Sequence, residues 1–166
     1  MPAADMTRRR DFLALAGFLL LCLAVSAAGG AITATSVDGW YRTLARPPFN
    51  PPDWVFAPVW TTLYVFMAVA AWRVWRSGPW AETRLALAAW GGQLGLNLAW
   101  SFLFFGLKSL CAAFLEVLVL LAAMVVTAGL FRRHDGWAAL LFLPYIAWVA
   151  FAAVLNGSLW YLNAGA

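Results

Sequence analysis

A series of long apolar stretches without charged residues limits how this chain can fold more than any other feature. Residues 12–34, 54–72, 85–107 and 136–166 contain no Asp, Glu, Lys, Arg or His, and Glu116 alone interrupts a fifth stretch, residues 109–131. Each is long enough for a helix to cross a bilayer, which takes about 20 apolar residues. A helix also satisfies its own backbone hydrogen bonds in lipid. We therefore predict an all-α integral membrane protein, a single domain over residues 1–166 forming a five-transmembrane-helix bundle. The predicted spans are about residues 12–34, 54–72, 85–107, 109–131 and 136–161.

Composition and charge exclude two broad classes of protein. Hydrophobic residues make up 64% of the 166 residues and charged residues 11%, and a water-soluble domain of this size could not bury so much apolar surface. The formal net charge of +4 does not indicate a nucleic-acid partner, because the positive residues lie at the ends of the spans and not on one soluble face.

Lys and Arg are unevenly divided between the two sides of the predicted bundle. The N-terminal side holds Arg8, Arg9, Arg10, Arg73, Arg76, Arg84, Arg132 and Arg133. The other side holds Arg42, Arg46 and Lys108. The positive-inside rule then predicts a cytoplasmic N-terminus in an inner membrane, although an outer bacterial membrane stays open. The first stretch also resembles a twin-arginine signal peptide, but it is longer than a typical signal core, so we expect a retained span.

The connection between the first two spans is long and rich in proline and aromatic residues. It runs from Thr35 to Asp53, and it could be an interfacial belt or a lid over one mouth of the bundle. Asn50 is a candidate N-cap for the second span. Pro58 and Pro144 lie within spans, where each removes a backbone hydrogen bond and can kink the helix.

The residues of familiar catalytic and metal sites do not occur in the required patterns. The single His134 lies in a short polar connection, and Cys22 and Cys111 lie in separate apolar spans. Two isolated thiols predict neither a disulfide framework nor a metal site. We therefore expect no metal and no catalytic triad.

The third span has two contrasting faces. Gln93, Asn97 and Trp100 follow a helical i, i+4, i+7 spacing, so they project within about 60° of one another, and amides in lipid should face protein. A stripe of small residues lies nearly opposite and consists of Gly91, Gly95 and Ala99. This stripe could pack within the monomer or form the seam of a homodimer, and we expect the homodimer.

The second and fifth spans carry aromatic stripes that could line a cavity or fill a core. Trp60 leads one stripe, and Trp148, Ala152 and Leu155 form the other, with a small residue between bulky ones. An apolar pocket with a few polar groups is typical of a small-molecule site. Glu116 has two interpretations, because an acid inside a span suggests function but this one could also reach the interface.

Several segments together resemble the TspO/MBR family, which comprises bacterial tryptophan-rich sensory proteins and the mitochondrial translocator protein, or peripheral benzodiazepine receptor. The matching segments are Trp40-Tyr41, Leu44-Ala45-Arg46-Pro47-Pro48, the run from Pro51-Pro52-Asp53-Trp54-Val55 through Pro58-Val59-Trp60 to Leu63-Tyr64, Gly92-Gln93-Leu94-Gly95-Leu96-Asn97, Trp100, Phe104-Phe105-Gly106, Pro144-Tyr145-Ile146-Ala147-Trp148 and Leu155-Asn156. They occur in the order expected for the family and cover four of the five spans.

The resemblance implies a five-helix bundle, commonly dimeric, with a cavity below the first loop that binds porphyrins, haem-like tetrapyrroles and benzodiazepine-type ligands. The ligand-binding residues that it implies are Trp40, Trp60, Asn97, Trp100, Trp148, Ala152 and Leu155. We expect a membrane receptor or regulator with porphyrin or haem as ligand and no obligatory cofactor.

The resemblance leaves other activities open. A transporter of porphyrins or other amphipathic molecules is one alternative, and light-dependent porphyrin degradation, with Trp148 as the reactive residue, is another. The mitochondrial members carry a sterol-recognition pattern of tyrosine followed by a cation. Here Gly157 occupies the tyrosine position and no cation follows it, so we do not expect specific sterol binding.

Overall fold

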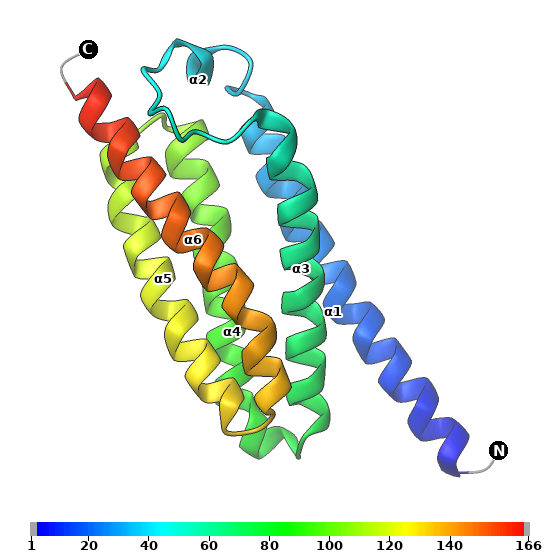
Figure 1. The fold of residues 1–166 in the computed structure, drawn as a ribbon. Helices are drawn as coiled ribbons and strands as arrows, with labels where there is room; N and C mark the ends of the chain where they lie inside the picture. The colour runs from blue at the N-terminus through cyan, green and yellow to red at the C-terminus, as the bar shows by residue number, and fades with distance from the viewer. Residues whose placement is uncertain (1–2, 165–166) are drawn as a thin grey trace.

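The computed structural model describes residues 3–164 and shows them to be almost entirely helical (Figure 1). The elements in chain order are α1 (Ala3–Ala34), α2 (Trp40–Thr43), α3 (Asp53–Arg76), α4 (Trp80–Ser101), the π-helical turn η1 (Phe102–Gly106), α5 (Leu110–Arg132) and α6 (Gly136–Asn163). No strand occurs in this range. The all-α prediction is therefore confirmed.

Four of the helices, α1, α3, α5 and α6, are long and apolar enough to cross a membrane. Helix α4 is not among them, because Gln93, Asn97 and several glycines lower its mean hydropathy. Both amide side chains are nevertheless buried in the protein. The described chain is thus a multi-pass membrane protein with four spans supported by length and composition, one fewer than the sequence predicts.

The helices α3 and α4 extend beyond the spans predicted from the sequence. Helix α3 continues to Arg76 and α4 begins at Trp80, so both extend past the charge-free segments into residues with charged side chains. Charged side chains mark where a helix leaves the hydrocarbon region, and they do not end the helix. The predicted third span also changes character before its end, since α4 gives way to η1 at Phe102.

The loop between α1 and α3 departs from the prediction at two points. It contains the one-turn helix α2, which begins at Trp40. Pro52, and not Asn50, is the N-cap of α3, and it makes no side-chain capping hydrogen bond. The side chain of Asn50 instead accepts a hydrogen bond from Tyr41 at 2.9 Å and donates one to the carbonyl of Pro51 at 3.0 Å. The N-cap prediction was wrong because Asn50 links two parts of the loop.

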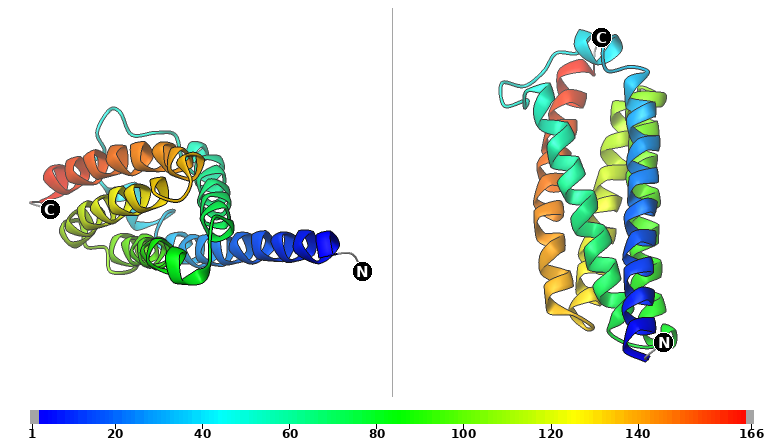
Figure 2. Two further views of the ribbon diagram at one scale, coloured as in Figure 1. Left: turned by 90° about the horizontal axis from the view of Figure 1, so that it is seen from below. Right: turned by 90° about the vertical axis from the view of Figure 1, so that its right-hand side faces the viewer.

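The long helices run side by side, and short connections make successive ones antiparallel (Figures 1 and 2). Helix α5 packs on both α4 and α6, while α1 packs chiefly on α3 and diverges from the bundle toward its N-terminus. The loop that contains α2 covers the end where the C-terminus also lies. We call this the loop end, and the opposite end, which carries the N-terminus, the basic end.

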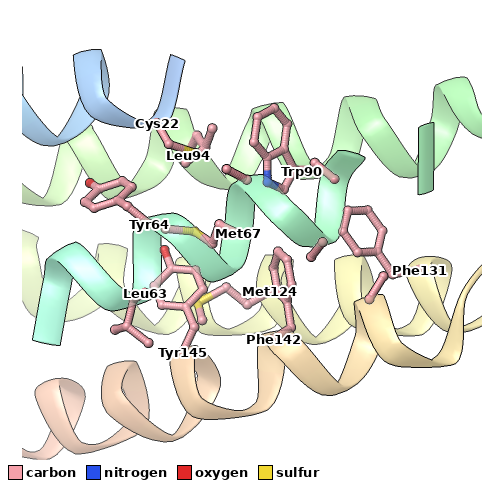
Figure 3. Close-up of a cluster of buried hydrophobic side chains, with 14 of the residues drawn as sticks. Cys22, Leu63, Tyr64, Met67, Trp90, Leu94, Met124, Phe131, Phe142 and Tyr145 are labelled. Carbon is pink, nitrogen blue, oxygen red and sulfur yellow. The ribbon is translucent and has the colours of Figure 1, made fainter. Parts of the chain in front are cut away.

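Large side chains from α3, α5 and α6 interlock at the centre of the bundle (Figure 3). Met67, Met124, Phe142 and Tyr145 are all fully buried there. Helix α3 adds a run of small buried residues, Ala68, Ala70, Ala71 and Val74. Small residues let helix backbones approach closely, which is how helices pack in lipid.

Ion pairs join three helices at the basic end. Arg76 pairs with Asp11 at 2.9 Å, and the indole of Trp72 donates to the Asp11 carbonyl at 2.9 Å, so α3 holds α1. Arg73 pairs with Asp135 at 2.8 Å. Asp135 is also the N-cap of α6 and accepts from the Ala138 amide at 2.9 Å. These contacts tie α1 and α6 to α3.

Asp135 has a lowered pKa. Partial burial by itself would raise the pKa, but hydrogen bonds from Arg73 and from the Ala138 and Trp137 amides, with the charge of Arg73, bring it below the ordinary value of 3.8. The ionised form is therefore the one that the folded protein favours.

The Glu116 carboxyl is buried within the bundle. Both of its carboxyl oxygens are enclosed by protein, and neither has a hydrogen-bond partner among the described residues. The interpretation of Glu116 as a side chain that extends to the headgroups is thus wrong. An acid in this position costs stability, because water cannot solvate it and no side chain compensates.

Replacing Asp135 should destabilise the protein in a pH-dependent manner. Asp135→Ala removes the cap and the ion pair and should cost about 1 kcal/mol or more, whereas Asp135→Asn keeps a capping acceptor and should cost less. Since the pKa is lowered in the folded state, the ionic part of the effect is complete above pH 3.8 and disappears as the pH falls below it. Thermal unfolding in detergent between pH 3 and pH 7 measures both effects; equal losses for the two variants at all pH values would contradict this role.

Replacing Glu116 by an apolar side chain should stabilise the protein. Glu116→Met keeps the volume and removes the unpaired carboxyl, so we expect a gain of about 1–3 kcal/mol. Leu118→Met is the matched control on the exposed face of the same helix, and it should have almost no effect. Chemical or thermal denaturation checks the comparison. A loss of stability in Glu116→Met would show that the carboxyl has a stabilising partner.

Candidate functional site

A continuous chain of buried hydrogen bonds joins α3, α4 and α6. Tyr64 donates to the Asn97 carbonyl oxygen at 2.7 Å, and the Asn97 amide nitrogen donates to the Tyr145 hydroxyl at 2.9 Å. Tyr145 in turn donates to Gln93 at 3.0 Å, and Gln93 donates to the sulfur of Met67 at 3.6 Å. We call these five residues the polar network.

Asn97, which the sequence predicts as a ligand contact, has a structural role in the polar network. Its carbonyl oxygen and its amide nitrogen each already have a protein partner. One amide hydrogen and one oxygen lone pair are left for a ligand. Asn97 can therefore donate one hydrogen bond to a ligand and accept another without disrupting the network.

A cluster of aromatic side chains lies beneath the loop at the loop end. Trp100 stacks on Phe104 with ring centroids 4.9 Å apart and an interplanar angle of 27°. Trp40 and Tyr41 from α2 reach the other sides of Phe104, at 5.7 Å and 6.1 Å. The indole of Trp100 donates to Asn156 on α6 at 3.1 Å. Leu155 belongs to the same cluster, so three predicted site residues, Trp40, Trp100 and Leu155, come together here.

The other predicted tryptophans flank the central core. Trp60 packs between Tyr64 at 5.8 Å and Tyr145 at 6.2 Å, so it contacts the polar network directly. Trp148 contacts Phe56 at 5.9 Å and Phe151 at 5.6 Å. Trp100 packs against both the central core and the cluster beneath the loop, and it connects the two groups.

Burial differs among the predicted site residues. Asn97 and Leu155 are buried. The half-buried ones are Trp40, Trp60, Trp100, Trp148 and Ala152. Each tryptophan therefore presents part of its ring to protein and keeps part accessible. Partial exposure of this kind is more typical of side chains that line a binding site than of side chains that fill a core.

The loop is fixed to the bundle at two places, and a further contact lies within the loop itself. Ser36 donates to the Phe105 carbonyl of η1 at 2.8 Å. Ala45 and Asn163 exchange two hydrogen bonds, each of 3.0 Å, which fasten the loop to the end of α6. The guanidinium of Arg46 lies over the ring of Tyr41 at 5.2 Å. Burial raises the pKa of Tyr41, although Arg46 and Asn50 partly offset this shift.

A groove of about 540 Å³ opens on the outer side of the bundle between α3 and α6. Its lining residues are Pro58, Val59, Thr62, Leu63, Phe66, Pro144, Ala147, Trp148 and Phe151. Both helical prolines, Pro58 and Pro144, border the groove. Among the seven predicted ligand residues, Trp148 alone lines it, so this groove is a lateral recess and differs from the predicted central cavity.

The small-residue stripe of α4 lies on the surface of the monomer. Gly91 and Gly95 are exposed, and a Cβ atom added at either position would meet nothing within 4 Å. Ala99 is half-buried. The stripe therefore has no packing partner in the described part of the monomer, which argues against the interpretation that it packs internally.

Metal-binding groups are not gathered at the loop end or elsewhere in residues 3–164. No three His, Cys, Asp or Glu side chains in this range are placed to hold a metal ion. Cys22 is buried, Cys111 is half-buried, and both are free thiols. The loop end offers aromatic rings, a few amide and hydroxyl groups, and the guanidinium of Arg46.

Several residues of the site are not among those predicted from the sequence. Tyr41, Phe56, Phe104 and Phe105 complete the aromatic contacts around Trp40, Trp100 and Trp148. The sequence signal for Phe104 and Phe105 is their position just before Gly106. An α-helical projection misplaces them, because they belong to a π-helical turn, a feature often found at functional sites.

Comparison with known proteins identifies the family of this chain. The model of the TspO/MBR family matches residues 18–162. The tryptophan-rich protein TspO of Archaeoglobus fulgidus is 39% identical over 154 residues, covering 93% of this chain and 99% of that protein. The TspO of Chlorobaculum tepidum is 40% identical over 156 residues, covering 93% and 98%. The human translocator protein is 38% identical over 128 residues, covering 76% of each chain. The chain belongs to the TspO/MBR family of membrane proteins.

Proposed function

We propose that this protein is a membrane receptor or regulator that binds porphyrin or haem-like tetrapyrroles among the aromatic side chains of the loop end. The observation that carries the proposal is a set of four half-buried tryptophans in two adjoining aromatic groups: Trp60 and Trp148 beside the central core, Trp40 beneath the loop, and Trp100 in contact with both. Flat aromatic rings stack favourably on a flat macrocycle. Membership of the TspO/MBR family supports the same ligand class through the resemblance described above.

The site supplies the groups that such a ligand needs. Trp60, Trp100 and Trp148 offer ring faces, and Ala152 is a small, half-buried residue one turn of α6 from Trp148 and Leu155. Asn97 offers its remaining amide hydrogen. Arg46 is only loosely paired with Asp53, at 4.0 Å, so its guanidinium is available to a propionate group at the loop end.

Ligand entry requires movement of side chains in the loop end. Trp100 stacks on Phe104, and Trp40 closes the same cluster from the loop. We propose that the loop acts as a lid, since α2 presents Trp40 to this cluster from outside the bundle. The contacts Ser36–Phe105 and Ala45–Asn163 are the ones that would hold it closed.

We also propose that α4 is the fifth span. It packs on α1, α3 and α5, and its amides lie in the polar network. Polar side chains that face protein are compatible with a membrane position even where mean hydropathy is modest. The basic end, with its excess of arginines, is then the cytoplasmic side of a bacterial cell membrane if that is the inner membrane.

The stripe of exposed Gly91 and Gly95 and half-buried Ala99 supports a homodimer seam. Small residues at this spacing let two helices approach closely in lipid. Because the stripe is opposite the polar network on α4, a partner bound there would leave the ligand site free. The proposed dimer therefore joins two complete sites.

A transporter of porphyrins or other amphipathic molecules is a second candidate. The lateral groove between α3 and α6 favours it, because the groove opens to the side of the bundle and Trp148 forms part of its wall. Saturable flux into vesicles that depends on Trp148 would support transport. Light-dependent porphyrin degradation involving Trp148 is a third candidate. It requires that each protein molecule destroy many porphyrin molecules under illumination. Loss of only one porphyrin per protein would not be catalysis.

Protoporphyrin should quench the tryptophan fluorescence of the purified protein saturably. Ala152→Leu fills the space beside Trp148 and Leu155 and should weaken binding about tenfold or more, as steric changes of this size do in apolar pockets. Trp148→Phe should weaken it less, because a smaller ring remains. Trp137→Phe is the control, since Trp137 is exposed and belongs to the basic end. Unchanged affinity in both site variants would rule out this site.

A bulky residue in the small-residue stripe should dissociate the proposed homodimer. Gly95→Leu prevents close approach of two α4 helices, and nothing in the monomer would obstruct the new side chain. Gly30→Leu adds the same volume at an exposed position of α1 with open space around it, and should leave the mass unchanged. Light scattering of the detergent-solubilised protein distinguishes the two. A dimer that persists in Gly95→Leu would place the seam elsewhere.

A further inference from the structure

A groove at the basic end has no part in the proposed tetrapyrrole site. Its lining residues belong to α5 and to the start of α6, after the turn that joins the two helices. That turn lies at the opposite end of the bundle from α2 (Figures 1 and 2). The volume of the groove is about 610 Å³. Its lining residues are Ala128, Gly129, Arg132, Gly136, Trp137, Ala139, Leu140 and Leu143. We call it the basic-end groove.

Small residues open the basic-end groove and leucines line its length. A Cβ atom added at Gly129 or Gly136 would meet nothing within 4 Å, so neither glycine is required by packing between the helices. Leu140 and Leu143 are each more than half exposed. The lining of α6 extends over about 10 Å of helix axis, roughly a third of the hydrocarbon core. The groove can therefore hold the headgroup-proximal part of an acyl chain.

The mouth of the groove carries unpaired positive charge. Arg132 lines the groove and, among residues 3–164, makes no ion pair or side-chain hydrogen bond. Arg133 follows it and is also exposed. The neighbouring acid, Asp135, does not neutralise them, because its carboxylate is occupied by Arg73 at 2.8 Å and by the Ala138 amide. The mouth thus favours an anion.

Trp137 places this mouth at the level of the lipid headgroups. Its side chain is 68% exposed, and it lines the groove beside the apolar positions. An exposed indole is typical of the boundary between hydrocarbon and headgroups. A guanidinium at that depth is well placed for a phosphate, which it can bind through two parallel hydrogen bonds.

We propose that the basic-end groove is a binding site for one anionic phospholipid, with an acyl chain along Gly129 and Leu140 and the phosphate at Arg132. The combination of an open apolar groove, an interfacial indole and a cation without a protein partner carries this inference. The apolar groove favours an acyl chain, and the arginines favour a negatively charged headgroup. Only a lipid that has both groups matches the whole site. The proposal does not depend on tetrapyrrole binding.

Native mass spectrometry of the full, delipidated protein can test the site. Phosphatidylglycerol and phosphatidylcholine of the same chain length are titrated separately. Phosphatidylglycerol should bind more tightly, and Arg132→Gln should weaken it about fivefold, in proportion to one basic residue near an anionic surface. Gly129→Leu, which fills the groove, should weaken both lipids. Arg84→Gln and Gly30→Leu change exposed positions on other helices and are the matched controls.

Four outcomes would overturn the proposal. These are equal binding of the two lipids by the unchanged protein, unaltered binding in Gly129→Leu, an equal loss of binding in Arg84→Gln, and full competition by soluble glycerol phosphate, which would indicate a site for free phosphate. Arg132→Lys keeps the charge but loses the two parallel hydrogen bonds, so it should bind phosphatidylglycerol with an affinity between those of the unchanged protein and Arg132→Gln. Thermal unfolding of each variant confirms that it is folded before its affinity is interpreted.

Discussion

The hydrogen bonds of the polar network are the interaction on which the rest of the structure depends. Lipid offers no water to solvate an amide, so Gln93 and Asn97 must find protein partners. Tyr64 from α3 and Tyr145 from α6 supply them, at 2.7 Å to 3.0 Å. Three helices are thereby fixed in rotation as well as in position. Apolar packing alone would restrict that rotation less, because it has no direction.

Once the polar face of α4 is fixed toward α3 and α6, the directions of its other faces are fixed as well. Trp100, one turn beyond Asn97, is directed to Asn156 and Phe104 beneath the loop. Gly91 and Gly95 are directed to the surface, where the described monomer leaves them unpacked. The proposed ligand site and the proposed dimer seam are therefore two consequences of one helix orientation. The π-helical turn η1 then brings Phe104 and Phe105 together beneath α2.

The two ends of the bundle have different chemistry. The loop end combines aromatic rings with amide and hydroxyl groups, and its loop is fastened by neutral hydrogen bonds. The basic end is held by the ion pairs Arg76–Asp11 and Arg73–Asp135. These pairs use Asp11 and Asp135 and leave Arg132 without an acidic partner among the described residues. Membrane proteins with such an asymmetry face two different environments, and each end here suits a different kind of ligand.

The sequence by itself determined the helical class, the membrane location and the inner and outer faces of α4, because charge-free length and helical spacing are local properties. The sequence also identified the family, because the family motifs are runs of neighbouring residues. It did not determine that Asn97 is engaged by two tyrosines, that Glu116 is enclosed without a partner, or that Asn50 binds Tyr41 and caps no helix. Those facts depend on which side chains of other helices come within about 3 Å. Only the tertiary structure decides this, because partner choice depends on the relative rotation and depth of whole helices.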